Sequence, residues 1–291
     1  DPSVPEVLLR QAYLYREMGV PILAMTKFYA VISTCLNLKL EETDYYQRLV
    51  LRAQAEIAET HFLQGNYEDA ADYLKRLLKL ENVDLERANV IYKLVQCYSK
   101  LNKNDECLGT ASLFLEKFPN HIDAPETRYI RVEVLKKMGR NKEAIAELET
   151  LLKSQQAAAS ADPQQWLYWQ QKAGNTIANE FYKEGDLLSA VQIYNTLAEI
   201  NSTPEWQLPA WYQIGIVYEN LKFPEKALEL YTKIVAREKE VKEPDDNLKA
   251  VLEMAAWRKR TIEWEAAARA SNKRLTDIVQ PPELVLNNGA G

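Results

Sequence analysis

Residues 211–231 read WYQIGIVYENLKFPEKALELY and decide the fold of this chain. Apolar and aromatic residues recur every three or four positions up to Tyr218 and again from Ala227, which predicts two helices joined by a short turn. Two helices approach to about 8 Å only where the side chains at their crossing are small. Gly215 and Ala227 are therefore expected to mark the crossing of an antiparallel helix pair.

The same pattern occurs six times along the chain, and the small residue of the second helix recurs at intervals of 46, 37, 37, 46 and 37 residues. We call these six positions the anchors: Ala24, Ala70, Cys107, Ala144, Ala190 and Ala227. Twelve residues before each anchor lies a small or slim residue of the first helix: Ala12, Ala58, Val95, Val132, Ala178 and Gly215. Glycine stands five residues before four anchors, and Asn102 and Lys222 take its place in the third and sixth copies. Six helix-turn-helix units are predicted.

These residues resemble the tetratricopeptide repeat family. The sixth copy carries the family signature as W-x2-I-G-x2-Y at residues 211–218, and the third copy ends on Phe-Pro at residues 118–119. The resemblance covers about residues 5–237. It implies an all-α, right-handed superhelical solenoid of antiparallel helix pairs, in which the first helix of each pair lines a concave, protein-binding groove.

The repeat length departs from the family pattern, because units recur every 37 or 46 residues whereas family units usually span about 34. Residues 118–144 resemble the longer units of bacterial cell-envelope tetratricopeptide proteins, including those of outer-membrane assembly and the Tol-Pal system. That resemblance favours a periplasmic or outer-membrane-associated location, and the first residue, Asp1, leads us to expect a trimmed N-terminus. Three cysteines without a CxxC spacing, Cys35, Cys97 and Cys107, favour the cytoplasm instead.

Insertions and turn residues divide the chain into five expected segments. These are units one to four at residues 1–153, a loop at 154–163, units five and six at 164–240, a capping helix at 245–270, and an extended or disordered tail at 271–291. Asp162-Pro163 predicts a helix start, since proline suits the first turn. A capping helix is expected because the last apolar seam of a solenoid would otherwise face water. Proline and glycine near the C-terminus predict the tail.

Charge and composition exclude several classes of function. The chain has 36 basic and 42 acidic residues, a net charge of -6, and basic residues that are spread along its length. Nucleic-acid binding depends on neutralising phosphates, so we expect no nucleic-acid partner. No apolar run approaches the ~18 residues needed to span a bilayer, so no transmembrane segment is expected.

No group of residues predicts catalysis, a cofactor or a metal site. The sequence has no glycine-rich phosphate loop, no nucleophile elbow and no HExxH motif. The two histidines, His61 and His121, cannot complete a zinc site with thiols so widely separated. We therefore expect a non-enzymatic protein without a cofactor. A hydrolase or transferase site beside the loop at 154–163 is the weakest alternative.

Counting back 15, 11 and eight residues from each anchor gives the side of every first helix that is expected to face the groove. From these positions and their neighbours we predict the partner-contacting residues: Tyr13, Phe62, Tyr92, Gln96, Tyr129, Glu133, Lys136, Asn175, Asn179, Tyr182, Lys183 and Tyr212. Tyrosine supplies large contact area with a hydrogen-bonding tip, and amides bond a partner's backbone. The mixture suits an extended segment or a helix. The alternative at each position is a tyrosine that only fills space between neighbouring helices.

Family members that bind a C-terminal carboxylate use lysine and asparagine on successive first helices. Leu9 and Tyr13 stand at those places in the first unit, so that clamp is absent there. A partial substitute is predicted from Asn175, Asn179 and Lys183 together with Lys136 and Lys137.

The sequence thus favours a protein-protein interaction scaffold that holds a peptide or protein segment in its groove, centred on the third to fifth units. The alternative is a structural spacer, or a self-associating component of a bacterial envelope assembly. A homo-oligomer is compatible with either hypothesis.

Overall fold

The computed structural model describes residues 3–37, 43–80, 85–153 and 162–279. Within these ranges the chain forms thirteen α-helices, one 3-10 helix and no strand. The predicted all-helical architecture of antiparallel pairs is confirmed. The chain divides into two compact units, Asp1–Ala173 and Gly174–Gly291.

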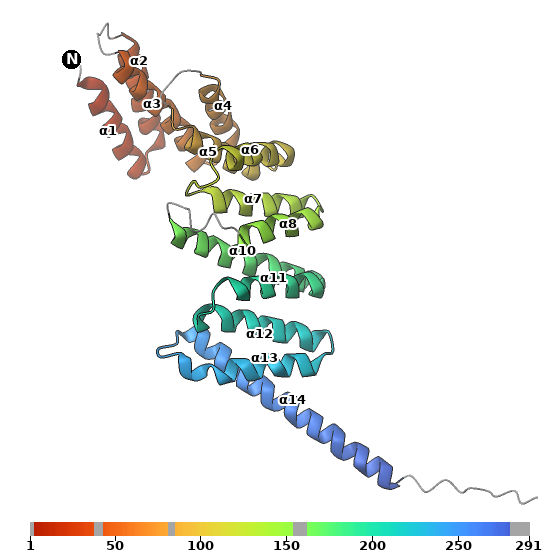
Figure 1. The fold of residues 1–291 in the computed structure, drawn as a ribbon. Helices are drawn as coiled ribbons and strands as arrows, with labels where there is room; N and C mark the ends of the chain where they lie inside the picture. The colour runs from red at the N-terminus through yellow and green to blue at the C-terminus, as the bar shows by residue number, and fades with distance from the viewer. Residues whose placement is uncertain (1–2, 38–42, 81–84, 154–161, 280–291) are drawn as a thin grey trace, which may run out of the picture. The chain divides into compact units, whose positions relative to one another are not determined.

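The first unit contains four helix pairs and the beginning of a further helix (Figure 1). Its helices are α1 (Val4–Glu17), α2 (Pro21–Asn37), α3 (Thr43–Leu63), α4 (Tyr67–Leu78), α5 (Arg87–Lys100), α6 (Asn104–Lys117), α7 (Ala124–Lys137), α8 (Asn141–Leu152) and, as far as Ala173, α10 (Pro163–Glu184). Each helix from α1 to α7 packs against the next, and α1 also contacts α3 as α5 contacts α7. In these two cases, the first helices of successive pairs therefore lie beside one another.

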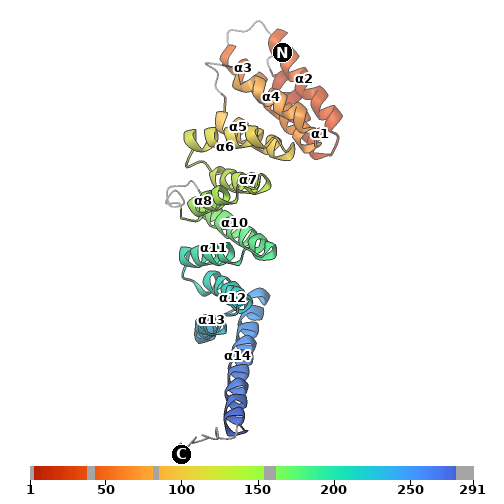
Figure 2. The ribbon, with the colours of Figure 1, turned by 90° about the vertical axis from the view of Figure 1, so that its right-hand side faces the viewer.

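The second unit starts within α10. It continues with α11 (Leu187–Ile200), α12 (Pro204–Asn220), α13 (Pro224–Ala236), the 3-10 helix η1 (Glu238–Glu240) and α14 (Asp246–Val279). Helix α14 packs on both α12 and α13 (Figure 2). It therefore takes the place that the first helix of a next pair would occupy.

The turn inside every helix pair has one residue in the left-handed region. The glycines there are Gly19, Gly65, Gly139 and Gly185, with φ of 73°, 80°, 72° and 85°. Asn102 (φ 55°) and Lys222 (φ 65°) take the same conformation in the third and sixth pairs. L side chains rarely adopt it, so glycine is favoured at this place for a backbone reason. All six predicted turns are confirmed.

The anchors are the centre of each pair. All six have no exposed surface, and neither have Ala12, Ala58, Val95, Val132 and Ala178 opposite them. Gly215 is required for the same reason, because an added Cβ would lie 2.5 Å from Cε1 of the buried Tyr231. Small residues are thus demanded by the close approach of the two helices.

The three cysteines, Cys35, Cys97 and Cys107, are free thiols buried between the helices. Burial raises the pKa of Cys97 to about 12 and that of Cys107 to about 11. Because the thiolate is the reactive form, these residues serve packing at neutral pH.

Helix α10 begins at Pro163, as predicted. Asp162 Oδ1 accepts hydrogen bonds from the backbone N–H groups of Gln164 (3.0 Å) and Gln165 (3.1 Å). A carboxylate at this place satisfies donors that the first turn of a helix leaves free. Residues 154–161 of the predicted loop lie outside the described residues.

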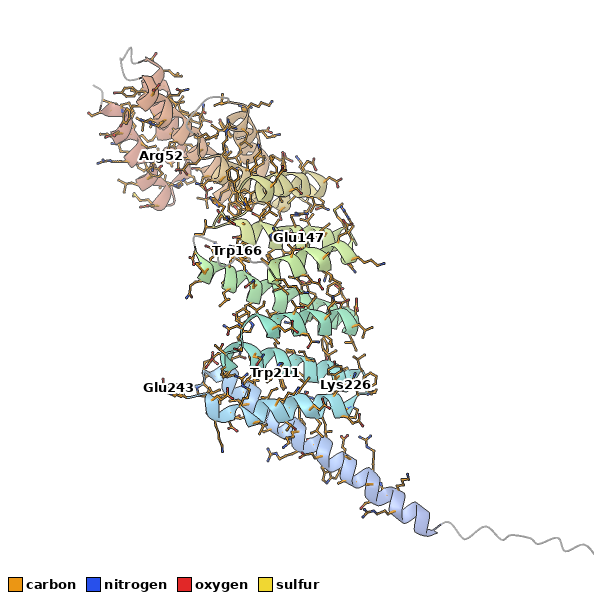
Figure 3. The ribbon with its side chains drawn as sticks, in the orientation of Figure 1. Arg52, Glu147, Trp166, Trp211, Lys226 and Glu243 are labelled. Atoms are coloured by element: carbon orange, nitrogen blue, oxygen red, sulfur yellow. The ribbon has the colours of Figure 1, made fainter. Side chains whose placement is uncertain are left out.

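The first half of α10 belongs to the first unit. Trp166 has no exposed surface (Figure 3), and the Trp169 ring lies 5.4 Å from that of Tyr129. Gln170 Nε2 donates to two carbonyl oxygens at the end of α8, at 3.1 and 3.0 Å. Along the chain, the division between the two compact units therefore falls inside α10, between residues 173 and 174, and not in the loop predicted at 154–163.

Helix α14 is longer than the capping helix predicted at 245–270. It continues to Val279, so residues 271–279 are helical where an extended or disordered tail was predicted. The reason is that no proline or glycine interrupts the chain before Pro281. Residues 280–291 lie outside the described residues.

Candidate peptide-binding groove

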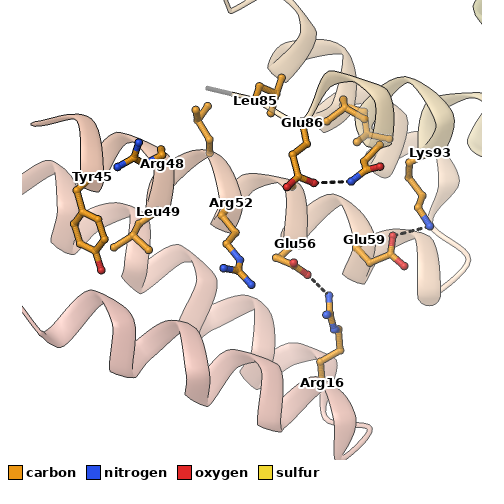
Figure 4. Close-up of a pocket in the computed structure, with 15 residues that line it drawn as sticks. Arg16, Tyr45, Arg48, Leu49, Arg52, Glu56, Glu59, Leu85, Glu86 and Lys93 are labelled. Carbon is orange, nitrogen blue, oxygen red and sulfur yellow. Dashed lines mark hydrogen bonds and ion pairs between the residues drawn. The ribbon is translucent and has the colours of Figure 1, made fainter. Parts of the chain in front are cut away.

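A groove of about 780 Å³ lies along α1, α3 and α5, in the first three helix pairs (Figure 4). We call it the first-unit groove. Its charged lining residues are Arg16, Arg48, Arg52, Glu56, Glu59, Glu86 and Lys93. Its apolar lining includes Leu49, Leu51, Leu74, Leu85 and Val90. A concave surface that combines apolar contact area with a few placed polar groups is typical of a binding site.

Glu56 organises one side of the groove. Its Oε2 accepts a hydrogen bond from Arg16 Nη1 at 2.6 Å, and its Oε1 accepts one from the Tyr13 hydroxyl at 2.8 Å. Burial and the neighbouring Glu56 carboxylate raise the pKa of Tyr13, so the hydroxyl stays protonated. The carboxylate is thus held between α1 and α3.

Lys93 and Glu59 organise the other side, where α5 meets α3. Lys93 Nζ lies 2.8 Å from Glu59 Oε2 and 4.5 Å from the centre of the Phe62 ring. Both side chains of this ion pair are partly exposed, so the pair contributes ~1 kcal/mol or less. Its role is to fix the position of the two charges.

Arg52 projects into the groove next to Glu56, on the side away from Glu59 and Lys93 (Figure 4). Its Nε donates to the Tyr13 hydroxyl oxygen at 2.9 Å, and this contact raises the pKa of Arg52. Among the described residues, no acceptor lies within hydrogen-bonding distance of its terminal nitrogens Nη1 and Nη2. An anchored guanidinium with two such donors matches the planar geometry of a carboxylate.

The predicted contact residues of the first unit lie mainly in intramolecular contacts. Tyr13 and Phe62 hold the charges of the first-unit groove, as described above. Gln96 Nε2 donates to the Tyr92 hydroxyl oxygen at 2.8 Å, and the Tyr129 hydroxyl donates to Glu133 at 2.9 Å. Burial, with a hydrogen bond to Glu126, raises the pKa of Tyr92. Whether these tyrosines contact a partner or only fill space between helices stays a prediction.

Three predicted residues of the second unit also have internal partners. The Tyr194 hydroxyl donates to Asn179 Oδ1 at 2.6 Å, and Asn220 Nδ2 donates to the Tyr182 oxygen at 2.6 Å. Tyr212 accepts a hydrogen bond from Arg258 Nε of α14 at 3.3 Å. The face that Tyr212 was predicted to present to a partner is therefore covered by α14.

The substitute carboxylate clamp falls on both compact units. Asn175, Asn179 and Lys183 lie in the second unit, whereas Lys136 and Lys137 lie at the end of α7 in the first. Lys183 is exposed and Asn175 is half-buried. This clamp stays a prediction.

Sequence reasoning missed the side chains that line the groove most directly. Arg52 and Glu56 precede the anchor Ala70 by 18 and 14 residues, and Asn89 and Lys93 precede Cys107 by the same distances. The signal was this recurrence of polar residues at two offsets. These residues were not predicted because the groove lies about one helical turn nearer the N-terminus of each first helix than the offsets of 15, 11 and eight residues implied.

The described residues were also compared with the requirements of a metal site and of a membrane-spanning helix. Among them, no three His, Cys, Asp or Glu side chains gather as a metal ion would require. None of the helices described combines the length and the apolar character needed to cross a bilayer.

Two segments of the chain match family models described as tetratricopeptide repeat, at residues 53–80 and 208–240. They contain the second and sixth anchors. The tetratricopeptide repeats that the resemblance implied are therefore confirmed in these two segments. The family models do not separate envelope proteins from other repeat proteins, so the likeness to outer-membrane-assembly and Tol-Pal proteins is not shown.

Several solved structures are similar to this chain at low identity. The apo form of the quorum sensor NprR from B. thuringiensis is 14% identical, with 87% of this chain and 68% of that chain covered and a TM-score of 0.49. A tetratricopeptide repeat protein from Parabacteroides merdae is 12% identical, covering 87% and 99%, with a TM-score of 0.45. MamA from Desulfovibrio magneticus is 20% identical, covering 66% and 97%, with a TM-score of 0.40. Similarity at this level carries no argument about function.

Proposed function

We propose that this chain is a protein-interaction scaffold whose first-unit groove binds an extended peptide segment with an acidic side chain or a C-terminal carboxylate. The observation that carries the proposal is Arg52, which is anchored through Nε and directs its two terminal nitrogens into the groove. The proposal moves the expected groove centre from the third to fifth units to the first three.

The neighbouring groups support the same assignment. Arg16 and Lys93 are already paired with Glu56 and Glu59, so those four charges offset one another within the groove. Arg52 has no such carboxylate within salt-bridge distance among the described residues. A partner carboxylate there would gain a charge-assisted, two-point contact, and hydrogen bonds of this kind contribute about 1.5–3 kcal/mol.

The apolar lining would supply the rest of the affinity. Leu49, Leu85 and Val90 line the groove beside the charged residues. Burying apolar area against them stabilises a complex without specifying its sequence. The partner we expect therefore alternates apolar and acidic side chains along an extended backbone.

The test is a selection of random peptides against the wild-type protein, followed by titration of one selected peptide by fluorescence anisotropy. We expect Arg52→Ala to weaken binding by about ten-fold or more, because it removes the two-point contact. The matched control is Arg140→Ala, which removes an equal charge from an exposed pair with Glu143 outside the first-unit groove.

Replacing the peptide's acidic residue by its amide should cost affinity with the wild type and little with Arg52→Ala, since the two changes remove one contact. Selection of neutral or basic peptides, together with equal binding by Arg52→Ala and Arg140→Ala, would sink the proposal.

A non-enzymatic role is part of this proposal, since tetratricopeptide repeat proteins are generally scaffolds. The spacer or envelope-assembly role stays the second candidate. Its self-associating form needs a surface that faces another copy, and α14 presents one.

A further inference from the structure

Helix α14 extends beyond the unit that it covers. Its first half packs on α12 and α13 with Leu248, Ala255 and Ile262 buried. The C-terminal half of the helix projects away from the other helices of the second unit (Figures 1 and 2). From Glu263 to Arg274 every side chain is exposed except that of Ala268, which is half-buried. Most of the stability of a helix in a protein comes from packing one of its faces, so a partner would stabilise the projecting half.

The uncovered side of α14 has the spacing of a coiled-coil seam. Residues with alternating intervals of three and four follow one line along the helix: Met254, Trp257, Thr261, Trp264, Ala268 and Ser271. We call this line the α14 seam. Trp257 is 52% and Trp264 71% exposed, which is unusual for such large apolar side chains. The sequence continues the same spacing with Leu275 and Ile278.

The α14 seam does not compete with the packing of α14 on its own unit. At 100° per residue, the seam is centred roughly 140° around the helix from the buried residues Leu248, Ala255 and Ile262. A second helix can therefore lie along the seam while the first half of α14 stays docked.

We propose that the α14 seam binds the α14 helix of a second copy of this chain in an antiparallel pair. In that arrangement, the α14 seam of one copy lies against the α14 seam of the other, with the residues in reverse order. The reversal that pairs Met254 with Ser271 of the other copy also pairs Trp257 with Ala268 and Thr261 with Trp264. Each large side chain then meets a small one, which is how well-packed layers form.

A parallel pair would be packed less well. It would place Trp257 against Trp257, and Ala268 against Ala268, so layers would alternate between crowding and voids. The antiparallel reversal is also centred on the midpoint of α14, because 254 and 271 have the same sum as the helix ends 246 and 279. The two helices would thus overlap along their whole length, about 50 Å.

Charge complementarity selects the same partner. In this register Glu253 and Arg274 of the other copy lie on the same flank of the seam, offset by two residues from direct opposition, and this contact occurs twice in the symmetric pair. Both side chains are exposed, and neither has an ion-pair partner among the described residues. Residues at this flank set the orientation of paired helices.

The experiment is sedimentation velocity over a concentration series. We expect the wild-type chain to be a dimer at micromolar concentrations and Trp264→Glu to be a monomer with unchanged helical circular dichroism, because Trp264 is exposed and contributes little to the monomer fold. A wild-type chain that stays monomeric throughout the series would overturn the proposal.

A charge exchange tests the antiparallel direction. Glu253→Arg and Arg274→Glu should each associate at least about ten-fold more weakly than the wild type, since each places like charges together. Mixing the two variants should restore a dimer that contains one copy of each. Lys239→Glu, on η1, is the control for a change of charge outside the seam. A dimer that none of the seam variants weakens would place the contact elsewhere and overturn the assignment.

Discussion

The two compact units are built from helix pairs of the same kind, but their arginine side chains have different hydrogen-bond partners. In the first unit, Arg52 reaches the groove with its terminal nitrogens free of described acceptors. In the second, Arg258 from α14 donates to both oxygens of Glu219, at 3.0 and 3.1 Å, and to the Tyr212 hydroxyl. The guanidinium of the first unit has no described acceptor at its terminal nitrogens, whereas that of the second holds the unit's own capping helix.

Under the proposed function, this difference separates a repeat face that can bind a partner from one that is already covered. Glu219 also accepts a hydrogen bond from the Tyr231 hydroxyl at 2.5 Å, and this contact together with burial raises the pKa of Tyr231. The Glu219 carboxylate thus accepts hydrogen bonds from two donors of its own unit, Tyr231 and Arg258. A repeat face becomes available to a partner where the chain supplies no such internal counterpart.

The largest expected effect concerns the boundary between the units. Trp166→Ala should lower the free energy of unfolding by about 3–5 kcal/mol, because a fully buried indole leaves a cavity. The loss should fall on the first unit, measured by denaturant unfolding with hydrogen exchange to locate it. Trp264→Ala is the control, since its 71% exposed side chain should change monomer stability by less than about 0.5 kcal/mol. Protection lost only in α11 to α13 would place Trp166 in the second unit instead.

The next prediction compares a glycine that has no room for a side chain with one that has open space around it. Gly215→Ala should destabilise the second unit by about 2 kcal/mol, because the new Cβ meets Tyr231, which is buried and held by its hydrogen bond to Glu219. Gly109→Ala, in α6 of the first unit, has open space around it and should stabilise by about 0.5–1 kcal/mol. Urea unfolding of both variants measures the contrast, and equal signs would contradict it.

A third prediction uses alkaline pH. Burial raises the pKa of Tyr194 to about 12, so its contribution to stability is complete below pH ~10 and is lost as the pH rises toward 12. Between pH 8 and 11 the wild type should lose about 1 kcal/mol that Tyr194→Phe does not lose. Denaturant unfolding at the two pH values measures the difference. A constant gap between wild type and variant would mean that Tyr194 ionises normally.

The smallest effect compares the two turns that lack glycine. Lys222→Gly in the second unit should stabilise by up to about 1 kcal/mol, since lysine at φ 65° is strained. Asn102→Gly in the first unit should gain less, because asparagine tolerates this conformation. Thermal unfolding should therefore rank Lys222→Gly above Asn102→Gly, and the reverse order would contradict the strain argument.

The sequence predicted the repeats well and the site only in part. The anchors and turns were readable because each involves residues at most twelve positions apart within one pair. The tyrosines were readable as a set, but Tyr92 and Tyr129 turned out to hydrogen-bond Gln96 and Glu133 on their own helices. Nothing in the composition of a helix face says whether its polar groups face a neighbour or a partner.

The sequence by itself determined that six helix pairs form, where their turns lie and that small residues lie at their crossings, since these depend on residues close together along the chain. Only the tertiary structure decided that Arg16 reaches Glu56 and that Arg258 reaches Glu219, contacts made across 40 and 39 residues of chain. Such contacts depend on how each pair packs on the next. The position of the groove depends on that packing as well, because a groove exists only between neighbouring pairs.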